Sequence, residues 1–440
     1  MLLTVLLRKI RCADMVILII ALFVLLFIGV PVAYALGLSA SAYFILMHPE
    51  LLPILPQRLF SGMNNYALIS LPLFILMGNI MNKSGITERL INLCLSMVGH
   101  LRGGLGLVNV LSSMIFGGIS GSSVSDTASI GSILIPEMKK RGYPVRFAAG
   151  ITVASSTMGM IIPPSVPIVL FAIVTQESVG RLFLGGVLPG LLIGGLQLLL
   201  VFSYAVWKKY PKEEECFSWG AVWSEFKGSL LVIAMPIFVV GSVVFGIATA
   251  TESAAMGVLY ALIVGVVVIG SLNVRLVIES FYESILTSAK IMMIIAMSTL
   301  YIWILALERL PQSLAAWLSG MSVGSVTMLL LMECVVLVAG TFIDVSPAIL
   351  LLAPVFMPAL AEVGVSPIVF GVLLISGLAI GACTPPVGNC LNVCASISKL
   401  SIGDIFIGAS PFLLANLLVL LLIIFFPQLV LWLPGIFMPE

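Results

Sequence analysis

The sequence predicts an all-α protein that crosses a membrane many times. Of its 440 residues, 61% are hydrophobic and only 9% are charged, whereas soluble domains contain ~45–50% apolar and ~25% charged residues. The mean hydropathy of +1.24 shows that the apolar excess extends through the whole chain. One helical crossing needs ~20 apolar residues, and the chain holds enough such segments for a polytopic membrane protein.

The composition also excludes several classes of protein. A net charge of +1 argues against nucleic-acid binding, which needs a basic surface. His48 and His100 lie far apart, and neither an HExxH motif nor a P-loop is present, so a transition-metal site and P-loop ATP hydrolysis are not expected. The seven cysteines include no CxxC pair and are expected to be reduced thiols.

Two short patterns resemble those of serine hydrolases. Gly118–Gly121 reads GISG, and Gly320–Gly324 reads GMSVG. A serine nucleophile needs a neighbouring base, and both histidines are expected in connectors near the membrane edges. The second pattern also requires a strand–turn–helix setting, which a helical chain does not offer. The sequence therefore does not predict an enzyme.

The chain begins with a basic tail and a long apolar run. Arg8, Lys9 and Arg11 precede the run, which extends from Met15 to about residue 46. We interpret it as an uncleaved first helix, with a signal peptide as the alternative. Further apolar segments are expected at about 66–81, 105–119, 124–138, 146–175, 181–207, 229–248, 253–271, 285–307, 322–343, 345–361, 366–398 and 405–433.

An internal repeat divides the chain. A polar loop at 208–228, with four lysines and four glutamates, separates the halves 1–207 and 229–440. Glycine and proline fix unusual backbone geometry, and a shift of 222 residues superimposes many of them, which predicts the same backbone path twice. The coinciding pairs are Gly118 with Gly340, Pro136 with Pro358, Gly142 with Gly364, Gly159 with Gly381, Pro163 with Pro385, Pro164 with Pro386, Gly186 with Gly408 and Pro189 with Pro411.

The two halves are predicted to have opposite orientations in the membrane. The connector at 139–146 contains four basic residues, whereas its counterpart at about 361–368 contains Glu362 and no lysine or arginine. Because basic connectors face the cytoplasm, these two connectors are expected on opposite sides, and the loop at 208–228 is expected in the cytoplasm. Inverted repeats of this kind are typical of secondary transporters.

Each half contains two elements that interrupt the helical pattern. Phe116–Asp126 is rich in glycine and serine and separates two apolar segments of about 13–15 residues, which are short for a crossing. Gly159–Ser165 and Gly381–Gly388 each contain two consecutive prolines, which break a helix. We therefore expect re-entrant helical hairpins at about 105–138 and 322–361, and broken helices at about 146–175 and 366–398.

Aspartate occurs only at positions 14, 126, 344 and 404. Asp126 and Asp344 lie in the two hairpin tips, and Asp404 lies in the polar turn before the last apolar segment. A carboxylate within a membrane segment is costly and by default indicates a function. The alternative is that Asp126 and Asp344 cap their hairpin helices by accepting backbone N–H bonds.

Hydroxyl groups cluster around the first tip and the first break. A hard cation such as Na⁺ prefers oxygen ligands, and broken helices also present carbonyl groups to it. The cluster therefore favours a cation site, with close helix packing as the alternative explanation for the hydroxyls. Its members are Ser120, Ser122, Ser123, Ser125, Ser155, Ser156, Thr157 and Ser165.

Several runs resemble the large membrane subunit (DctM-like) of tripartite ATP-independent periplasmic (TRAP) transporters. They are IGVPVAYALGLSA (28–40), SLPLFILMGNIMNKSGI (70–86), FGGISGSSVSDTASIGSILIPEM (116–138), GMIIPPSVP (159–167), TESAAMGVLYALIVG (251–265), GTFIDVSPAILLLAPVFMP (340–358) and IGACTPPVGNCLNV (380–393). The resemblance covers nearly the whole chain. It implies a sodium-driven importer of the elevator type, in which a transport domain with two hairpins moves against a scaffold.

The resemblance further implies partners and a location. The partners would be a small four-helix membrane subunit and a periplasmic substrate-binding protein that delivers a small organic anion, such as a C4-dicarboxylate, sialic acid or a sugar acid. The chain would be a multi-pass protein of the bacterial inner membrane, with Na⁺ as coupling ion and no other cofactor. A stand-alone sodium-coupled dicarboxylate or citrate symporter is the alternative; a channel is disfavoured because the polar residues form no continuous stripe.

Site residues follow from the resemblance by position. One sodium site would combine Ser120, Ser122, Ser123 and Asp126 with Gly159, Ile162 and Pro163. Its mirror would combine Gly340, Thr341 and Asp344 with Gly381, Cys383 and Thr384. Substrate would contact Ser165, Ser123 and Thr384. The chain departs from the family pattern in residues 1–11, which have no clear counterpart, at Ala250, where proline is expected, and at Cys383, whose thiol is a doubtful sodium ligand.

Overall fold

The computed structural model describes residues 18, 20–26, 28–212, 217–310, 312–313 and 324–439. In these ranges every regular element is a helix, which confirms the predicted all-α fold. Nine helical segments of the same ranges are long and apolar enough to cross a membrane. The basic tail at 8–11, Asp14 and residues 320–323 of the GMSVG pattern lie outside the described residues.

The helices of the two halves are listed here by their bounds. The first half contains α2 (Val32–Met47), η1 (Pro49–Ile54), α3 (Leu55–Met63), η2 (Tyr66–Ile69), α4 (Ser70–Lys83), α5 (Ile86–Val98), α6 (Gly104–Ser120), α7 (Ser123–Lys140), α8 (Val145–Ser156), α9 (Met158–Ile161), α10 (Val166–Thr175) and α11 (Val179–Trp207). The second contains α12 (Trp219–Val244), α13 (Ala250–Ile263), the π-helical η3 (Val264–Ile269), α14 (Val274–Leu307), α16 (Ser325–Phe342), α17 (Val345–Glu362), α18 (Pro367–Gly381), α19 (Asn389–Ser398), α20 (Ile402–Phe425) and α21 (Gln428–Phe437).

Helix bounds recur at a constant spacing between the halves. α17 begins and ends 222 residues after α7, and α18 begins 222 residues after α8. The peptide bonds Pro163–Pro164 and Pro385–Pro386, at the same spacing, are both cis. The backbone therefore repeats in the register that glycine and proline indicated. The opposite orientation of the halves in a membrane stays a prediction.

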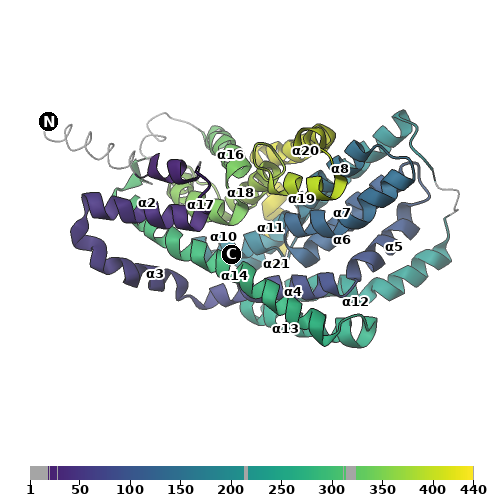
Figure 1. Cartoon of the computed structure of the whole chain (residues 1–440), viewed down its shortest axis with the longest axis horizontal. Helices are drawn as coiled ribbons and strands as arrows, with labels where there is room; N and C mark the ends of the chain where they lie inside the picture. The colour runs from purple at the N-terminus through teal and green to yellow at the C-terminus, as the bar shows by residue number, and fades with distance from the viewer. Residues whose placement is uncertain are drawn as a thin grey trace.

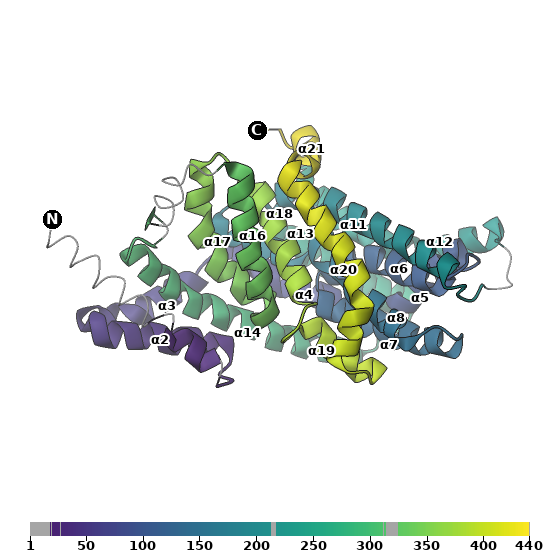
Figure 2. The same cartoon turned by 90° about the horizontal axis from the view of Figure 1, so that it is seen from above.

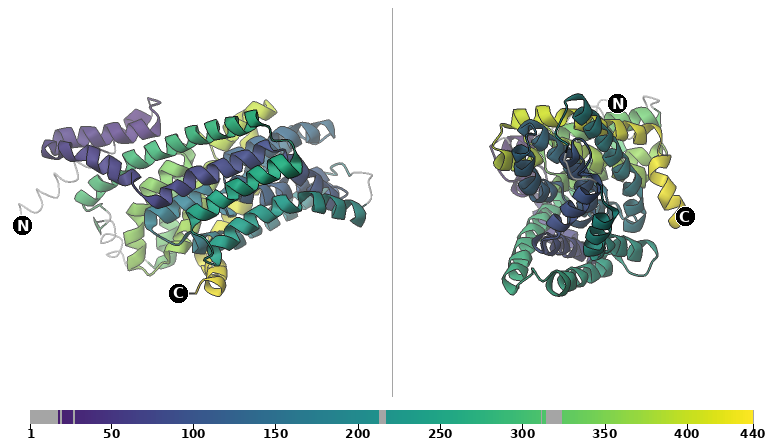
Figure 3. Two further views of the ribbon diagram at one scale, coloured as in Figure 1. Left: turned by 90° about the horizontal axis from the view of Figure 1, so that it is seen from below. Right: turned by 90° about the vertical axis from the view of Figure 1, so that its right-hand side faces the viewer.

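Long-range helix contacts organise the molecule. α14 packs against α2, α3, α4 and α17; Figure 1 shows α2 and α3 at one end of the molecule, with α5 and α12 toward the other. Figure 2 shows α20 beside α8 and α18, with which it packs. Figure 3 shows α13 and α14 beside α4 on one face. The elements around the predicted site pack across the halves, since α20 contacts α8 and α19 contacts α7.

The structure corrects the expected course of three segments. The first apolar run is interrupted at Gly29, which has φ = +90°, and at Pro31, which precedes α2. The last segment breaks between α20 and α21 at Pro427, because proline lacks the N–H that would continue the helix. α6 and α7 contain 17 and 18 residues, more than the expected 13–15. Both lengths fall at the lower end of the range of about 17–25 residues that membrane-crossing helices have.

Helix α12 begins at Trp219, so the last part of the predicted loop at 208–228 is helical. The Ser218 hydroxyl accepts the N–H of Ala221 at 3.5 Å and caps the helix. Within the first turns Trp223 stacks on Phe226. The loop prediction was wrong for these residues because charged and polar side chains lower the local hydropathy without opposing a helix.

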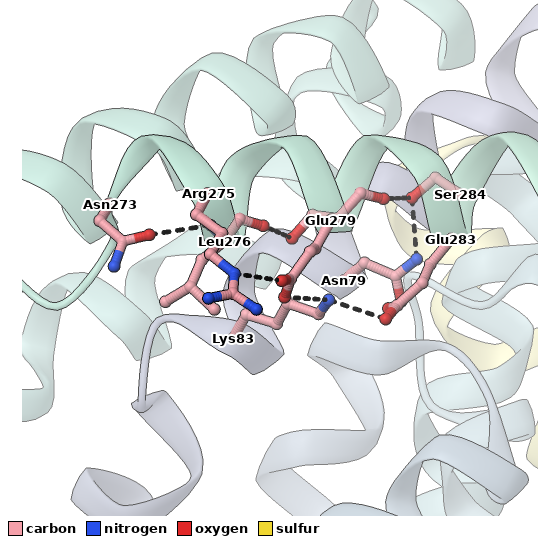
Figure 4. Close-up of polar contacts among 9 residues, drawn as sticks. Asn79, Lys83, Asn273, Arg275, Leu276, Glu279, Glu283 and Ser284 are labelled. Carbon is pink, nitrogen blue, oxygen red and sulfur yellow. Dashed lines mark hydrogen bonds and ion pairs between the residues drawn. The ribbon is translucent and has the colours of Figure 1, made fainter.

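Helix α14 also begins earlier than predicted, at Val274 instead of about 285. Its first turns carry polar side chains that contact α4, as Figure 4 shows. Lys83 Nζ lies 2.7 Å from Glu283 Oε1 and 3.7 Å from Glu279 Oε2, and Asn79 donates to Ser284 Oγ at 2.8 Å. These paired charges explain why a hydropathy criterion places a connector where the chain forms a helix.

Helices α8 and α20 touch backbone to backbone. A Cβ on Gly408 would overlap the carbonyl oxygen of Arg146, and a Cβ on Gly150 would overlap the backbone of Gly408. We expect Gly408→Ala to lower the thermal unfolding midpoint, because overpacking a tight interface costs about 1–3 kcal/mol. Gly403→Ala is the matched control, since nothing lies within 4 Å of its added Cβ on the same helix. Equal midpoints for the two variants in detergent would contradict this packing argument.

Candidate cation and solute site

The chain reverses direction between α6 and α7 at two residues. Gly121 has φ = +62°, a left-handed conformation that glycine adopts without strain, and Ser122 is extended. The Gly121 carbonyl accepts the N–H of Val166 at 3.4 Å, and a Cβ on Gly121 would lie 3.1 Å from that nitrogen. The first tip therefore lies against the start of α10, beside the break.

Asp126 lies in the first turn of α7 and is fully buried (0% exposed). Its Oδ1 accepts a hydrogen bond from the Ser120 hydroxyl, whereas its Oδ2 has no hydrogen-bond partner among the described residues. A Cβ on Gly159 would overlap Oδ2, so the carboxylate rests directly on the backbone of α9. An unpaired carboxylate in apolar surroundings is costly, which makes this oxygen a candidate cation ligand.

The first break brings further oxygen atoms to the same region. Ile162 is extended and Pro163 follows it, which interrupts the helix between α9 and α10. The carbonyl oxygen of Pro163 faces α6, where a Cβ on Gly118 would lie 2.9 Å from it. Ser165 is buried, and its hydroxyl donates to the Met160 carbonyl at 2.5 Å. Its oxygen still has lone pairs to offer, but its contact with substrate stays a prediction.

The second tip has a different environment. Asp344 is exposed and is the N-cap of α17, where its Oδ1 accepts the N–H of Val345 at 2.9 Å and the Asn389 amide at 3.2 Å. The Thr341 carbonyl accepts the N–H of Val387 at 3.2 Å, which joins this tip to the second break. The tip and the break thus meet in both halves, but the carboxylate of the second half already satisfies backbone and amide donors.

Glycines allow close approach in the second half too. A Cβ on Gly381 would lie 2.6 Å from the Cα of Gly340. The Thr341 hydroxyl donates to the Val338 carbonyl of its own helix at 2.8 Å, and the hydroxyl of Thr384, just after α18, donates to the Ile380 carbonyl of that helix at 2.8 Å. Both hydroxyl oxygens therefore keep lone pairs toward a ligand.

The two tip aspartates are not equivalent positions. At the 222-residue spacing, Asp344 corresponds to Ser122 and Asp126 corresponds to Ala348. Ser122 and Asp344 are the N-cap residues of α7 and α17, respectively. The capping alternative left open by the sequence thus describes Asp344, whereas Asp126 caps nothing and lies buried one turn farther along its helix.

Two predicted ligands contact the opposite half. Ser123 is buried, and its Oγ lies 3.1 Å from the Sγ of Cys390 on α19. Cys383 is also buried, and its thiol donates to the Val153 carbonyl on α8 at 3.4 Å. These contacts join the first hairpin and α8 to the second broken helix. Among the described residues, neither side chain forms a hydrogen bond with Asp126 or Asp344.

Several hydroxyls of the predicted cluster donate hydrogen bonds to carbonyls one turn earlier in the chain. Ser156 donates to the Val153 carbonyl and Thr157 to the Ala154 carbonyl, both at 2.8 Å. Such back-bonding is common for serine and threonine in helices. It supports the packing alternative for these two residues, while Ser120 alone of the cluster bonds the Asp126 carboxylate directly.

Sequence reasoning missed two buried amides that support the first break. Gln197 on α11 and Asn416 on α20 both donate to the Ala154 carbonyl, at 3.1 and 3.3 Å, near the end of α8. Asn416 also donates to Thr157 Oγ1 at 2.9 Å, and Gln197 donates to Asn416 at 2.7 Å. The sequence could have indicated these two residues, since each is the single amide side chain in its apolar helix. Polar groups at membrane depth need partners.

Comparison with known proteins assigns the family. Residues 19–429 match the family model described as the tripartite ATP-independent periplasmic transporter, DctM component. The chain belongs to the DctM family. Its DctM relatives include the sialic acid TRAP transporter large permease protein of Vibrio cholerae, 37% identical over 94% of this chain and 97% of that one. Another is the C4-dicarboxylate TRAP transporter large permease protein of Rhodobacter capsulatus, 32% identical over 94% and 97%.

Solved structures agree on the fold of this DctM protein. The YdaH transporter of Alcanivorax borkumensis superposes with a TM-score of 0.61 at 16% identity, over 90% of this chain and 91% of that one. MtrF of Neisseria gonorrhoeae gives 0.60 at 15% identity, over 87% and 84%. As a DctM protein, the chain is a multi-pass permease subunit of the inner membrane and not an enzyme. Large permease subunits of TRAP transporters work with a small membrane subunit and a substrate-binding protein.

Proposed function

We propose that this chain is the permease subunit of a sodium-coupled importer for a small organic anion, and that it moves its solute by an elevator mechanism. The buried carboxylate of Asp126 carries this proposal. Its unpartnered Oδ2 lies against the broken helix at Gly159, where a monovalent cation would neutralise it in apolar surroundings. Carbonyl oxygens of the break supply the ligand type that a hard cation prefers.

An anionic solute suits the two helices that begin at the breaks. α10 starts just after Ser165 and α19 just after Gly388, and helix N-termini carry a partial positive charge. The relatives are named for sialic acid, C4-dicarboxylates and 2,3-diketo-L-gulonate, all of which are carboxylic acids. A carboxylate bound beside a sodium ion would strengthen the binding of that ion, and the reverse holds equally.

The proposed moving part contains α6–α11 and α16–α20, with α6–α7 and α16–α17 as re-entrant hairpins. Contacts across the halves support treating it as one body, since α20 packs on α8 and α19 on α7. The proposed scaffold contains α2–α4 and α12–α14, in which charged pairs between α4 and α14 hold the helices together. A small four-helix subunit and a periplasmic binding protein complete the proposed system. The stand-alone symporter lacks a supporting relative among those described above.

Sodium coupling is testable in two steps. Radioactive sodium should bind the purified protein and be displaced by unlabelled sodium but not by potassium. In proteoliposomes with both partner proteins, one of labelled sialic acid, succinate or 2,3-diketo-L-gulonate should accumulate under an inward sodium gradient and not under a matched potassium gradient. Absence of displaceable sodium binding, or uptake equal under both gradients, would contradict the proposal. Undiminished uptake without the binding protein would favour the stand-alone symporter.

A further inference from the structure

A second buried carboxyl group lies outside the candidate site. Glu333 is in the middle of α16 and is only 4% exposed. Its Oε1 has no hydrogen-bond partner among the described residues. A Cβ on Gly377 of α18 would overlap this oxygen and lie 2.9 Å from the carboxyl carbon. The carboxyl therefore packs on the bare backbone of α18, where the absence of a side chain makes room for it.

The described helices that pack against α16 offer no basic side chain to neutralise Glu333. The helices that pack against α16 are α17, α18 and α20. α18 carries no titratable residue, α17 carries only Glu362 at its end, and α20 carries only Asp404, which pairs with Arg146. On α16 itself the other titratable residue is the exposed Cys334. The described stretch 324–398 contains no lysine, arginine or histidine. An ionised Glu333 would thus be an uncompensated buried charge.

A metal cation is a poor candidate for neutralising this carboxyl. Hard cations need several oxygen ligands around them. Near Gly377 the Ser376 hydroxyl already donates to the Val372 carbonyl at 2.7 Å, and the backbone belongs to the continuous helix α18. A proton needs only one carboxyl oxygen. The first half has no such group, since Leu111 and Ser155 occupy the corresponding positions at the 222-residue spacing.

We propose that Glu333 is a proton-binding site in the interface of α16 and α18, occupied at neutral pH. The bound proton turns the side chain into a neutral acid, which can pack on the α18 backbone. Loss of the proton would place a charge between two apolar helices, so the proton is released only where α16 separates from α18 or water enters between them. This inference does not depend on sodium coupling, because it concerns different residues and a different ligand.

Infrared spectroscopy of the protein in lipid tests the proposal directly. At pH 7, where solvent-exposed carboxyl groups are ionised, the spectrum should contain the C=O stretching band of a protonated carboxyl group. Glu333→Gln should remove that band and accumulate in the membrane at normal abundance, because the amide matches the neutral acid in shape. The control Glu88→Gln removes an exposed carboxyl on α5 and should keep the band.

Two further measurements protect the test from a poorly folded variant and from the alternative ligand. Labelling all glutamates with carbon-13 in the unchanged protein should shift the band, which distinguishes Glu333 from the buried Asp126. Adding sodium at constant pH should leave the shifted band in place. A spectrum without a glutamate band at pH 7 would overturn the proposal. A band that disappears when sodium is added would assign the site to a metal cation and overturn it equally.

Discussion

Asp126→Asn is expected to raise the sodium concentration for half-maximal uptake by about tenfold or more. A carboxylate attracts a monovalent cation about 4 Å away by about 4 kcal/mol at an effective dielectric constant of about 20, and about 1.4 kcal/mol corresponds to about tenfold in affinity. Asparagine keeps the shape and can still accept the Ser120 hydroxyl bond, so the change isolates the charge. The measurement is initial uptake against sodium concentration at matched membrane abundance.

Asp344→Asn is the paired comparison for this result. Asp344 is exposed and caps α17, and asparagine caps a helix about as well as aspartate does. Its sodium curve should therefore move much less than that of Asp126→Asn. Asp404→Asn is not a neutral control, because Asp404 pairs with Arg146 and accepts the Ser401 hydroxyl. An unchanged sodium curve for Asp126→Asn would reduce Asp126 to a structural residue.

Gly159→Ala is expected to abolish uptake while the protein still inserts. The added Cβ would overlap Asp126 Oδ2 and lie 2.9 Å from its Cγ. Relief requires either displacement of the carboxylate or movement of α9 away from α6, where a Cβ on Gly117 would lie 2.9 Å from the Gly159 Cα. Both movements separate groups that would converge on one ion in the proposed site, and a displacement of about 1 Å can cost about a hundredfold where geometry controls a rate.

A matched substitution separates this effect from the general effect of a methyl group in a membrane helix. Gly195 lies within α11, and nothing is within 4 Å of a Cβ placed there. Gly195→Ala should retain uptake and sodium binding, whereas Gly159→Ala should lose both at equal abundance. If the two variants transported equally well, Gly159 would not be a contact of the carboxylate during transport.

Backbone landmarks made much of the fold predictable. The paired prolines and the glycines located both breaks and the bounds of α7 and α17 within a few residues, because proline and glycine restrict the backbone wherever they occur. Hydropathy failed at the starts of α12 and α14. In α14 the charges are paired with Lys83 of α4, and a hydropathy criterion cannot anticipate a partner that lies about 200 residues away.

The candidate site was less predictable than the fold. Because Asp126 and Asp344 both lie in hairpin tips, the sequence predicted the same role for both. Their burial depends on what packs around each tip, and of the two only Asp126 is buried. Ser123 and Cys383 contact the opposite half, which no local pattern encodes. The sequence pattern did not predict a role for Glu333, because one carboxyl group hardly changes the hydropathy of an apolar helix. Whether Ser120, Thr341 and Thr384 hold sodium stays a prediction.

The backbone contact between Gly150 and Gly408 has a consequence for how the two halves respond to ions. α8 belongs to the first half and α20 to the second, and at this point their backbones are in direct contact with no side chain between them. An ion bound at the first tip, as proposed above, would therefore also restrict the helices of the second half against which the second tip packs. Less disorder would then remain for a second ion to remove, so the proposed binding of sodium at two separate tips would be cooperative although the ions never meet.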